Sequence, residues 1–461
     1  MSLDPGAFEA LVPYRFITFT IPNPSHSINA DHHLHTPLLR VAVLDSPIQP
    51  TITTDPPRVA AMIVPKHRET DWTFSTQTGH LQLLLSSPEF SRLIIVGNLP
   101  ANSLPDTYNR PTCLDHANQA KLEETLTPLL IALLPKLAFK DGLPEIPFLR
   151  YEDDVVRSVV LEKCVGSCVG EMLIEDVELQ FECDREFRRR LRFKRMPNLI
   201  QTQIRLVSNS NPDVISGSNC VGLGELGFKP DTQVLVHPYL TPMVASLSLI
   251  SSCLDQRIRG GFRPKALCLG VGGGALLGFL NAQLGFEVIG VEADEAVLRV
   301  AKQYFGLEDG EFIQLRVGDG IELINKFSHQ ANEQNVDVWD AKFDVIMVDL
   351  DSSDARMGIS APPMEFVQKS VLLAARLVLN ELGVLVINVI PPTRAFYETL
   401  IHEFQEVFQE LYEIDVGNGE NFVLIATASP MATASGDCEN TFLTRLKLVI
   451  SGAYIDSIRK L

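Results

Sequence analysis

A glycine-rich stretch in the second half of the chain has the residue types and spacing of a nucleotide-binding loop. The loop from Gly270 to Gly274 follows an apolar run of strand type and precedes an apolar segment at helical spacing. Strand, glycine loop and helix together let the backbone approach a nucleotide-bearing ligand closely, with the helix N–H groups pointing at it. The spacing Gly270, Gly272 and Ala275 also satisfies the dinucleotide fingerprint, but so would a tight turn between two buried elements. The assignment of this loop as a nucleotide-binding site therefore depends on the residues that follow the neighbouring strands.

Acidic residues follow the next three predicted strands, at the strand ends where ligands bind in open parallel sheets. Glu292 comes 22 residues after Gly270, and a carboxylate there can accept hydrogen bonds from both ribose hydroxyls. Asp319 is placed to contact an adenine amino group. The fourth strand is followed by an acidic cluster that consists of Asp349, Asp351 and Asp354.

These four features together indicate the kind of cofactor. A nicotinamide enzyme would explain the glycine loop and Glu292, whereas Asp319 and the acidic cluster point to an adenosyl sulfonium cofactor. Each carboxylate alone could be a loop or helix-cap residue, but four features at successive strand ends favour a binding site. The candidate cofactor-binding residues are Gly270, Val271, Gly272, Gly273, Gly274, Glu292, Ala293, Asp319 and Gly320, and the candidate catalytic residues are Asp349 and Asp351.

The elements that would position these residues alternate between strand and helix from about residue 237 to 428, as a doubly wound α/β sheet requires. The pattern predicts a seven-stranded, mostly parallel, Rossmann-like sheet with helices on both faces, preceded by a helix from His237 to Leu254. The last strand should be antiparallel, because the turn between Leu411 to Val416 and Asn421 to Thr427 is too short for a crossover. After a first strand that ends at the glycine loop, the other strands are predicted at Phe286 to Val291, Phe312 to Val317, Phe343 to Val348 and Val384 to Ile390.

The whole chain divides into four predicted regions. Residues 1–145 should form a small N-terminal accessory α/β region with a long amphipathic helix from Asp115 to Phe139. Residues 146–235 are interpreted as a β-meander and linker, 236–430 as the domain with the candidate site, and 431–461 as a tail without an assigned role. The meander contains a run from Arg185 to Arg195 with six arginines and one lysine. Its alternation with Leu191 and Phe193 predicts a strand with one charged, solvated face, and the alternative is a basic patch that docks a partner.

Composition excludes several classes of protein. The chain has 461 residues, 46% hydrophobic and 21% charged, as expected of a globular protein with a full core. Its net charge of −18 argues against direct nucleic-acid binding and favours a basic protein as partner. Eight cysteines without a CxxC motif indicate neither a disulfide framework nor a zinc ribbon, and no metal is expected at Asp31, His32, His33 and His35, which lack partner ligands nearby. We expect a soluble, cytoplasmic protein without a membrane span.

Longer motifs reveal a family resemblance. LCLGVGGGALL, VIGVEAD, QYFGL, VGDGIELI and FDVIMVDLDSSD resemble the spermidine synthase-like branch of class I S-adenosylmethionine-dependent methyltransferases. With MIVPKHRETDWTF, IPFLRYEDDV, LIEDVEL and LVHPYLTPMVASL, the sequence is similar to the C-terminal domain of the methyltransferase-like protein 13 family, over about residues 59–428. The resemblance implies S-adenosylmethionine as cofactor and methylation of the N-terminal α-amine of elongation factor 1-alpha. In that family a separate N-terminal domain methylates a lysine of the same substrate, but no second glycine loop precedes Gly270, which argues against the lysine activity here.

Methyl transfer to an amine suits the candidate residues, because it mainly needs proximity, alignment and stabilisation of a cationic product. An α-amino group has a pKa near 8, against about 10.4 for lysine, so much of it is neutral at cell pH. Asp349, or Asp351 as the next candidate, can hold that amine and attract its charge. Two alternatives stay open: a spermidine synthase-like aminopropyltransferase, although LDSSDARMGIS lacks the Asp-Pro continuation usual there, and a catalytically lapsed binding scaffold. Oligomeric state and final methylation state are not indicated by the sequence.

Overall fold

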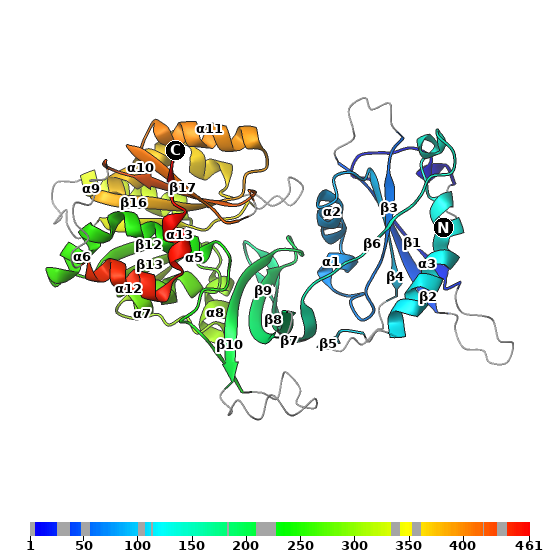
Figure 1. The fold of residues 1–461 in the computed structure, drawn as a ribbon, viewed down its shortest axis with the longest axis horizontal. Helices are drawn as coiled ribbons and strands as arrows, with labels where there is room; N and C mark the ends of the chain where they lie inside the picture. Colours follow the sequence, from blue (N-terminus) through cyan, green and yellow to red (C-terminus); the bar gives the residue numbers. More distant parts are fainter. Residues whose placement is uncertain are drawn as a thin grey trace. The chain divides into compact units, whose positions relative to one another are not determined.

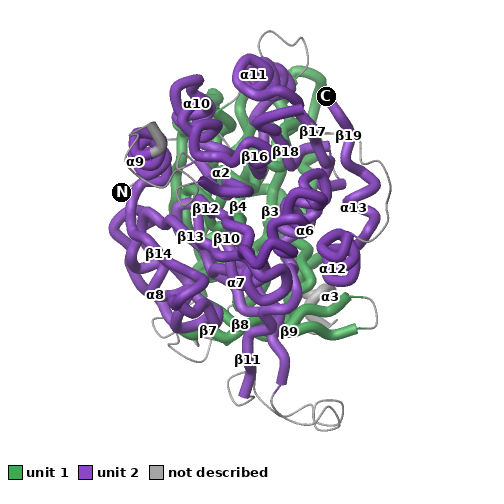
Figure 2. The backbone as a smooth tube through the Cα atoms, turned by 90° about the vertical axis from the view of Figure 1, so that its left-hand side faces the viewer, with its two compact units in different colours: residues 1–161, 175–186, 196–199 green, residues 162–174, 187–195, 200–461 purple. Residues whose placement is uncertain are grey.

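The computed structural model describes residues 5–24, 37–47, 56–99, 107–111, 114–181, 184–208, 227–332, 342–352, 361–417, 419–430 and 440–461. The chain forms two compact units (Figure 2). The first comprises residues 1–161, 175–186 and 196–199, and the second comprises residues 162–174, 187–195 and 200–461. The boundary between the units therefore runs through the predicted meander, and all of the candidate site residues belong to the second unit. The histidine cluster at residues 31–35, residues 209–226 of the predicted linker, and Asp354 lie outside the described residues.

The second unit is built on an eight-stranded sheet with the order β14-β13-β12-β15-β16-β18-β17-β19 (Figure 1). The first five strands in this order, β14, β13, β12, β15 and β16, pair in parallel with one another. Strand β18 runs antiparallel to both of its neighbours, β16 and β17. The strands are β12 (Lys265–Leu269), β13 (Glu287–Glu292), β14 (Ile313–Val317), β15 (Phe343–Val348), β16 (Leu379–Val389), β17 (Glu410–Asp415), β18 (Phe422–Thr427) and β19 (Arg459–Lys460).

The sequence prediction for this sheet needs one correction. The antiparallel pairing of the last two predicted strands is confirmed, since β17 and β18 pair from Glu410 with Thr427 to Asp415 with Phe422. The sheet has eight strands instead of seven, because the two-residue strand β19 pairs with Tyr412 and Glu413 of β17. Such a short strand carries no periodicity that a sequence pattern could reveal.

Helices cover both faces of this sheet, and alternate residues of each strand supply the two cores. On β12, Ala266 and Cys268 face one core, while Leu267 and Leu269 face the other. The first core receives side chains from α5 (Leu240–Ala245), α6 (Ser251–Arg259), α7 (Ala275–Leu284), α8 (Glu295–Tyr304) and α12 (Thr441–Val449). The second receives side chains from α9 (Gly320–Asn332), α10 (Lys369–Val378) and α11 (Arg394–Gln405).

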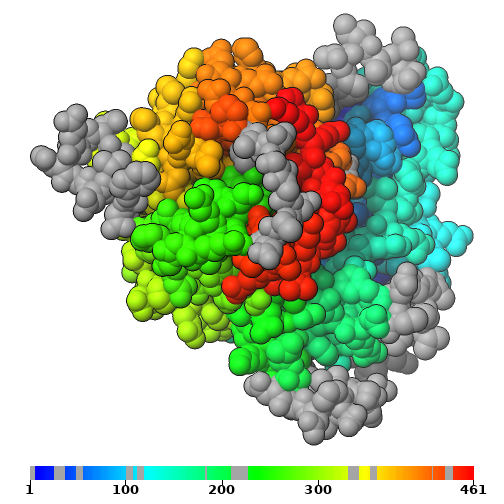
Figure 3. Space-filling model, turned by 60° about the vertical axis from the view of Figure 1, so that its left-hand side comes forward, coloured from blue at the N-terminus to red at the C-terminus, as the bar shows by residue number. Residues whose placement is uncertain are grey.

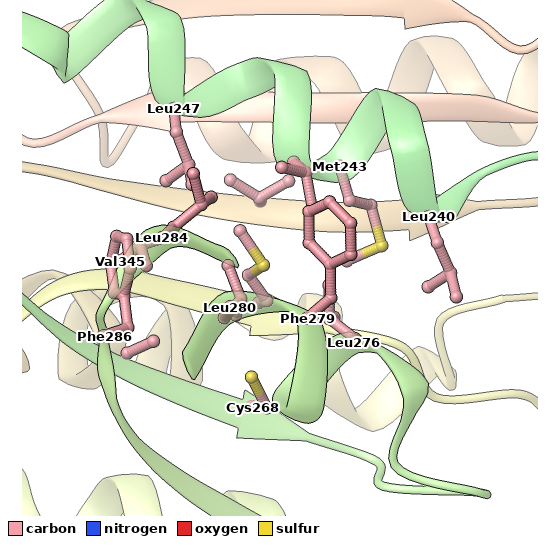
Figure 4. Close-up of a cluster of buried hydrophobic side chains, with 14 of the residues drawn as sticks. Leu240, Met243, Leu247, Cys268, Leu276, Phe279, Leu280, Leu284, Phe286 and Val345 are labelled. Carbon is pink, nitrogen blue, oxygen red and sulfur yellow. The ribbon is translucent and has the colours of Figure 1, made fainter. Parts of the chain in front are cut away.

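The first core fixes the helix that follows the glycine loop. Figure 4 shows Leu276, Phe279 and Leu280 of α7 packed among side chains from the sheet and from the helices around Leu240 and Leu247, all of them buried. Full burial of each such side chain stabilises the fold by about 1.5–3 kcal/mol. The glycine loop is therefore attached to a helix that cannot shift easily.

The predicted helix from His237 to Leu254 is instead three consecutive helical segments, α5, the 3-10 helix η4 (Ser246–Ile250) and α6. At the first junction the Ser246 hydroxyl donates a hydrogen bond to the carbonyl of Met243 at 2.5 Å. A serine hydroxyl competes in this way with the regular backbone hydrogen bonds of a helix, which helps to explain the tighter turn.

The C-terminal residues belong to the sheet unit. The first core buries Phe442 and Leu446 of α12 and also Ile450, which directly follows this helix. The backbone N–H of Phe442 donates to Asp255 of α6 at 3.1 Å. Helix α13 (Gly452–Asp456) then leads to β19. Figure 3 shows this segment in red beside the green segment that contains α5 and α6. The predicted tail is thus a structural part of the unit that holds the candidate site.

A second sheet has the strand order β11-β10-β9-β8-β7-β5, and its central strands are the predicted meander. Strand β9 does not have the solvated charged face that its arginines predict. Arg192 is buried with 8% of its surface exposed, Arg188 donates to Gln203, and Arg189 donates to the carbonyl of Tyr304. The strands are β5 (Thr107–Asn109), β7 (Val155–Gly166), β8 (Gly170–Phe181), β9 (Asp184–Phe193), β10 (Ile200–Ser208) and β11 (Phe228–Pro230).

The first unit contains a five-stranded sheet with the order β1-β2-β4-β3-β6. Helix α3 packs on one face and α1 and α2 on the other. Across the central strands β2 and β4, Asp45 pairs directly with Arg92, and both side chains are fully buried. The elements are β1 (Phe16–Pro22), β2 (Leu38–Asp45), β3 (Val59–Ile63), β4 (Arg92–Asn98), β6 (Phe148–Leu149), α1 (Trp72–Ser75), α2 (Gln77–Leu85) and α3 (Leu114–Ala132), with the short 3-10 helices η1 (Pro5–Phe8) and η2 (Lys136–Phe139).

Helix α3 is shorter than the sequence predicts. The pattern of apolar residues continues to Phe139, but the α-helix ends at Ala132 and a 3-10 helix begins at Lys136. Pro135, which precedes this 3-10 helix, has no backbone N–H to donate and clashes with a preceding helical turn, which favours an end of the α-helix before it, although α3 accommodates Pro128 in its interior. Among the described residues, none of the helices is both long and apolar enough to cross a membrane.

Candidate functional site

The glycine loop lies directly against the segment that follows β15. Gly270 has φ +85°, and a Cβ atom at this position would come within 2.1 Å of the backbone oxygen of Asp349. Both the backbone conformation and this close approach require glycine. Gly274 at the start of α7 has φ +80°, and a Cβ there would meet Leu307 at 2.7 Å. The glycines thus serve a close backbone approach, and the loop and Asp349 are brought together as the sequence suggests.

The meander supplies a contact to the loop that sequence reasoning missed. Thr202 of β10 accepts a hydrogen bond from the backbone N–H of Gly273 at 2.9 Å. A Cβ on Gly273 would lie 2.3 Å from the methyl group of Thr202, so glycine is required for this packing as well. No local sequence signal indicates this pair, because the two residues are 71 positions apart.

Glu292 lies beside the glycine loop, at the end of β13. Its Oε2 accepts hydrogen bonds from the backbone N–H groups of Val271 at 3.2 Å and Gly272 at 3.4 Å, and its Oε1 accepts one from Asp294 at 3.2 Å. Burial raises the pKa of Glu292, and the three backbone N–H groups partly offset that rise. Ala293, the next residue, is exposed. The carboxylate therefore braces the loop in addition to any role toward a ligand.

Asp319 and Gly320 lie at the start of α9. The Oδ1 atom of Asp319 accepts hydrogen bonds from the backbone N–H groups of Ile321 at 2.7 Å and Glu322 at 2.9 Å, so this side chain caps the helix. Asp319 is exposed. The backbone N–H of Gly318 donates to the carbonyl of Glu292 at 2.9 Å, which links this segment to the end of β13.

Asp349 directly follows β15, and two side-chain donors hold its carboxylate. The hydroxyl of Tyr239 donates to its Oδ2 at 3.0 Å, and the amide of Asn388 donates to its Oδ1 at 3.2 Å. Burial raises the pKa of Asp349 to about 6, although both hydrogen bonds act in the opposite direction. Burial and the neighbouring Asp349 raise the pKa of Tyr239 as well, so its hydroxyl keeps its proton and remains a donor. A carboxylate with a pKa near neutrality is typical of a functional site.

Unlike Asp349, Asp351 forms an ion pair with an arginine of the protein. Arg195 donates to both carboxylate oxygens, at 3.1 and 3.3 Å, and Gln201 donates to Oδ2 at 3.3 Å. Arg195 follows β9 and Gln201 belongs to β10. One arginine of the basic run therefore neutralises the second candidate catalytic residue, and Asp349 is left as the better candidate to attract a cationic substrate.

Sequence reasoning missed four side chains that hold these carboxylates and the loop, namely Tyr239, Asn388, Arg195 and Thr202. Two of them had a sequence signal: Tyr239 lies in the motif LVHPYLTPMVASL that carries part of the family resemblance, and Arg195 ends the basic run that begins at Arg185. Within the parts of the chain that the structure describes, His, Cys, Asp and Glu side chains form no group of three or more that could hold a metal ion.

Sequence comparison finds curated relatives that share one name. The chain is 27% identical to the eEF1A lysine and N-terminal methyltransferase of Homo sapiens over 410 residues, which cover 86% of this chain and 54% of the relative. The proteins of the same name from Danio rerio and Xenopus laevis are 27% and 28% identical, over 80% and 79% of this chain. The chain spans about half the length of the curated relatives it matches, 51% and 50% for these two. These relatives confirm the family resemblance of the motifs.

Family models and solved structures add little to this comparison. None of the protein-family models matches the sequence. Similar solved structures include human methyltransferase-like protein 13 in complex with SAH, at 23% identity and a TM-score of 0.39 over 48% of this chain and 94% of that one. A probable spermidine synthase from Corynebacterium glutamicum has 14% identity and a TM-score of 0.42 over 65% of this chain and 89% of its own. Both TM-scores are too low to support an assignment.

Proposed function

We propose that this chain is an S-adenosylmethionine-dependent protein methyltransferase of the class I, Rossmann-like type that acts in the cytoplasm. Its proposed acceptor is the N-terminal α-amine of elongation factor 1-alpha, with a lysine of that protein as the alternative acceptor. The observation that carries the proposal is the position of Asp349, whose backbone touches the glycine loop while its carboxylate is held by Tyr239 and Asn388. The shared name of the relatives supports the reaction type and the substrate.

The residues around the glycine loop fit an adenosyl cofactor. Gly270 to Gly274 lead into the N-terminus of α7, Glu292 lies beside them with two carboxylate oxygens, and Asp319 is exposed at the next strand end. We expect Glu292 to hold the ribose hydroxyls and Asp319 to contact the adenine, with Ala293 and Gly320 beside them. When bound, S-adenosylmethionine supplies a methyl group on a sulfonium centre.

The contribution of Asp349 is to hold and orient the acceptor amine. Its carboxylate is ionised in most molecules at neutral pH, because its pKa is about 6. A positively charged amine next to it would lower that raised pKa and keep the carboxylate charged. Tyr239 and Asn388 fix the two carboxylate oxygens, so the amine meets an acceptor that is already oriented.

The two alternative functions receive less support. An aminopropyltransferase would use the same loop and the same carboxylate, but the relatives are named methyltransferases. A half-buried carboxylate with a raised pKa beside the glycine loop is typical of a functional site, which favours an enzyme over a scaffold without activity.

An assay with labelled cofactor tests the acceptor. We expect label on elongation factor 1-alpha whose initiator methionine has been removed, and none on the same factor with a blocked N-terminus. Equal labelling of the blocked factor would refute the α-amine proposal and identify a lysine. Transfer only from decarboxylated cofactor to putrescine would show that the protein is a polyamine enzyme.

Replacement of Glu292 by alanine should weaken binding of S-adenosylmethionine by about 2 kcal/mol, or roughly 30-fold in Kd, because the ribose hydroxyls lose a charged acceptor. The N–H groups of Val271 and Gly272 lose their acceptor as well. Calorimetry with wild type and variant measures the change, and thermal melting shows whether the variant is folded. Unchanged affinity in a folded variant would remove Glu292 from the cofactor site, and binding of a nicotinamide dinucleotide instead would move the protein to another class.

A further inference from the structure

The turn between β7 and β8 is fastened to one buried carboxylate near the candidate cofactor site. The backbone N–H groups of Cys168 and Val169 both donate to Oδ2 of Asp294, at 2.6 and 3.0 Å. Only 1% of Asp294 is exposed. A Cβ atom on Gly166, which ends β7, would come within 2.3 Å of the same Oδ2 atom, so the turn can approach Asp294 only because residue 166 is glycine.

Asp294 also connects to the glycine loop through Glu292. Its backbone N–H donates to Oε1 of Glu292 at 3.2 Å, and Oε2 of Glu292 accepts from the loop N–H groups of Val271 and Gly272. The other carboxylate oxygen of Asp294 accepts from the N–H of Ala296 at 3.0 Å and caps helix α8. An unbroken series of hydrogen bonds thus runs from the meander turn through Asp294 and Glu292 to the glycine loop.

A charged carboxylate suits this position better than an amide would. Burial alone would raise the pKa of Asp294, but hydrogen bonds from the backbone N–H groups of Val169, Cys168 and Ala296 outweigh it and hold the pKa below its ordinary value. An ionised carboxylate accepts on both oxygens. An amide has only one acceptor oxygen, so asparagine could keep the helix cap or the turn, but not both. With its oxygen toward Ala296, asparagine caps α8 as well as aspartate does, and its NH2 group then faces the turn N–H groups and releases the turn.

We propose that Asp294 is a positioning residue that couples the β7–β8 turn to the cofactor-binding carboxylate Glu292. The proposal rests on the proposed function, since it takes S-adenosylmethionine as the ligand of Glu292. The turn, when fastened, holds Asp294 and through it the segment that orients Glu292. Because coupling between two sites is reciprocal, a cofactor bound at Glu292 must fasten the turn more tightly by the same factor.

Two variants release the turn in different ways and leave Glu292 unchanged. Gly166→Ala pushes the turn away from Asp294 through the added Cβ, and Asp294→Asn removes its second acceptor. For each we expect the Kd for S-adenosylmethionine to rise about fivefold or more, the usual size of a coupling between sites. Ser167→Ala is the matched control, because this exposed side chain lies in the same turn and its loss leaves the backbone contacts intact. Its Kd should equal that of the wild type.

Hydrogen exchange at the amides of Cys168 and Val169 separates coupling from a merely structural contact. In the wild type these amides should exchange more slowly when S-adenosylmethionine is added, and in Glu292→Ala this added protection should disappear. Wild-type affinity in both turn variants, or exchange at the turn that ignores the cofactor, would overturn the coupling while leaving the proposed function intact. If the wild type binds no S-adenosylmethionine, the proposed function and the coupling are both refuted.

Discussion

Replacement of Asp349 by asparagine should lower turnover by about a hundredfold or more, as expected when one positioned electrostatic contact is removed. Asparagine has the same shape and can still contact Tyr239 and Asn388, so the fold and most of the cofactor affinity should be kept. Only the negative charge that attracts and orients the amine is lost. Single-turnover rates with labelled cofactor measure the effect, and calorimetry with S-adenosylmethionine shows that the cofactor still binds.

Asp351→Asn is the matched control for this substitution. Its charge already pairs with Arg195, so its removal should reduce turnover much less than Asp349→Asn does. If Asp351→Asn lowered turnover the more strongly of the two, Asp351 would be the residue that holds the amine.

The pH dependence of kcat/KM offers an independent check of Asp349. The active form of this carboxylate is deprotonated and its pKa is about 6, so wild-type activity should be lost as pH falls through about 6. The Asp349→Asn variant should lack this inflection, because asparagine does not titrate. The titration of the substrate α-amine, near pH 8 in ordinary surroundings, should remain in both proteins. A wild-type profile without an inflection near 6 would contradict the role given to Asp349.

Replacement of Asp45 by alanine should destabilise the first unit by about 3–5 kcal/mol, because it leaves a fully buried arginine without its counter-charge. Arg92 donates to both oxygens of Asp45, at 2.6 and 3.2 Å, and its remaining N–H groups reach the carbonyls of Phe8, Ala10 and Leu133. The pair thus ties β2 and β4 to the first helical turn of the unit and to the end of α3. Hydrogen exchange at the amides of β2 and β4 measures the local stability directly.

Two further variants separate the cost of an unpaired charge from the cost of lost packing. Lys136→Ala removes the partner of Glu9 in an exposed ion pair of the same unit, and pairs of this kind contribute little. The double variant Asp45→Leu with Arg92→Met removes the uncompensated buried charge and should recover part of the loss, although Arg15 loses its ion pair with Asp45 and the carbonyls that Arg92 held lose this donor. A small effect of Asp45→Ala alone would show that water reaches Arg92 once the carboxylate is gone.

Sequence could predict those parts of the site that are marked by a pattern of a few consecutive residues. The strand before Gly270 is apolar on both faces, which predicts a buried parallel strand, and the glycines mark the point where the backbone must pass closely. Glu292 and Asp349 were found because the carboxyl ends of parallel strands meet at one edge of a sheet. Such rules need only the order of the elements, and that order could be read from periodicity.

The remaining features depend on contacts between distant parts of the chain. Tyr239 and Asp349 are 110 residues apart, and Arg195 and Asp351 are 156 residues apart. The alternation of β9 correctly predicted a strand, but periodicity cannot show whether its arginines face water or a carboxylate. The assignment of roles to Glu292, Asp319 and Asp349 stays a prediction, as do the domain limits at residues 145, 235 and 430.

The short strand β19 has a consequence for the behaviour of the protein in solution. Without it, β17 would present unpaired backbone groups at the end of a large sheet, and such an edge invites pairing with another chain. Arg459 and Lys460 occupy this edge, pair with Glu413 and Glu410, and place two positive charges where a foreign strand would have to dock. Loss of these two residues should therefore favour aggregation through strand-to-strand association, even where the fold and the site survive.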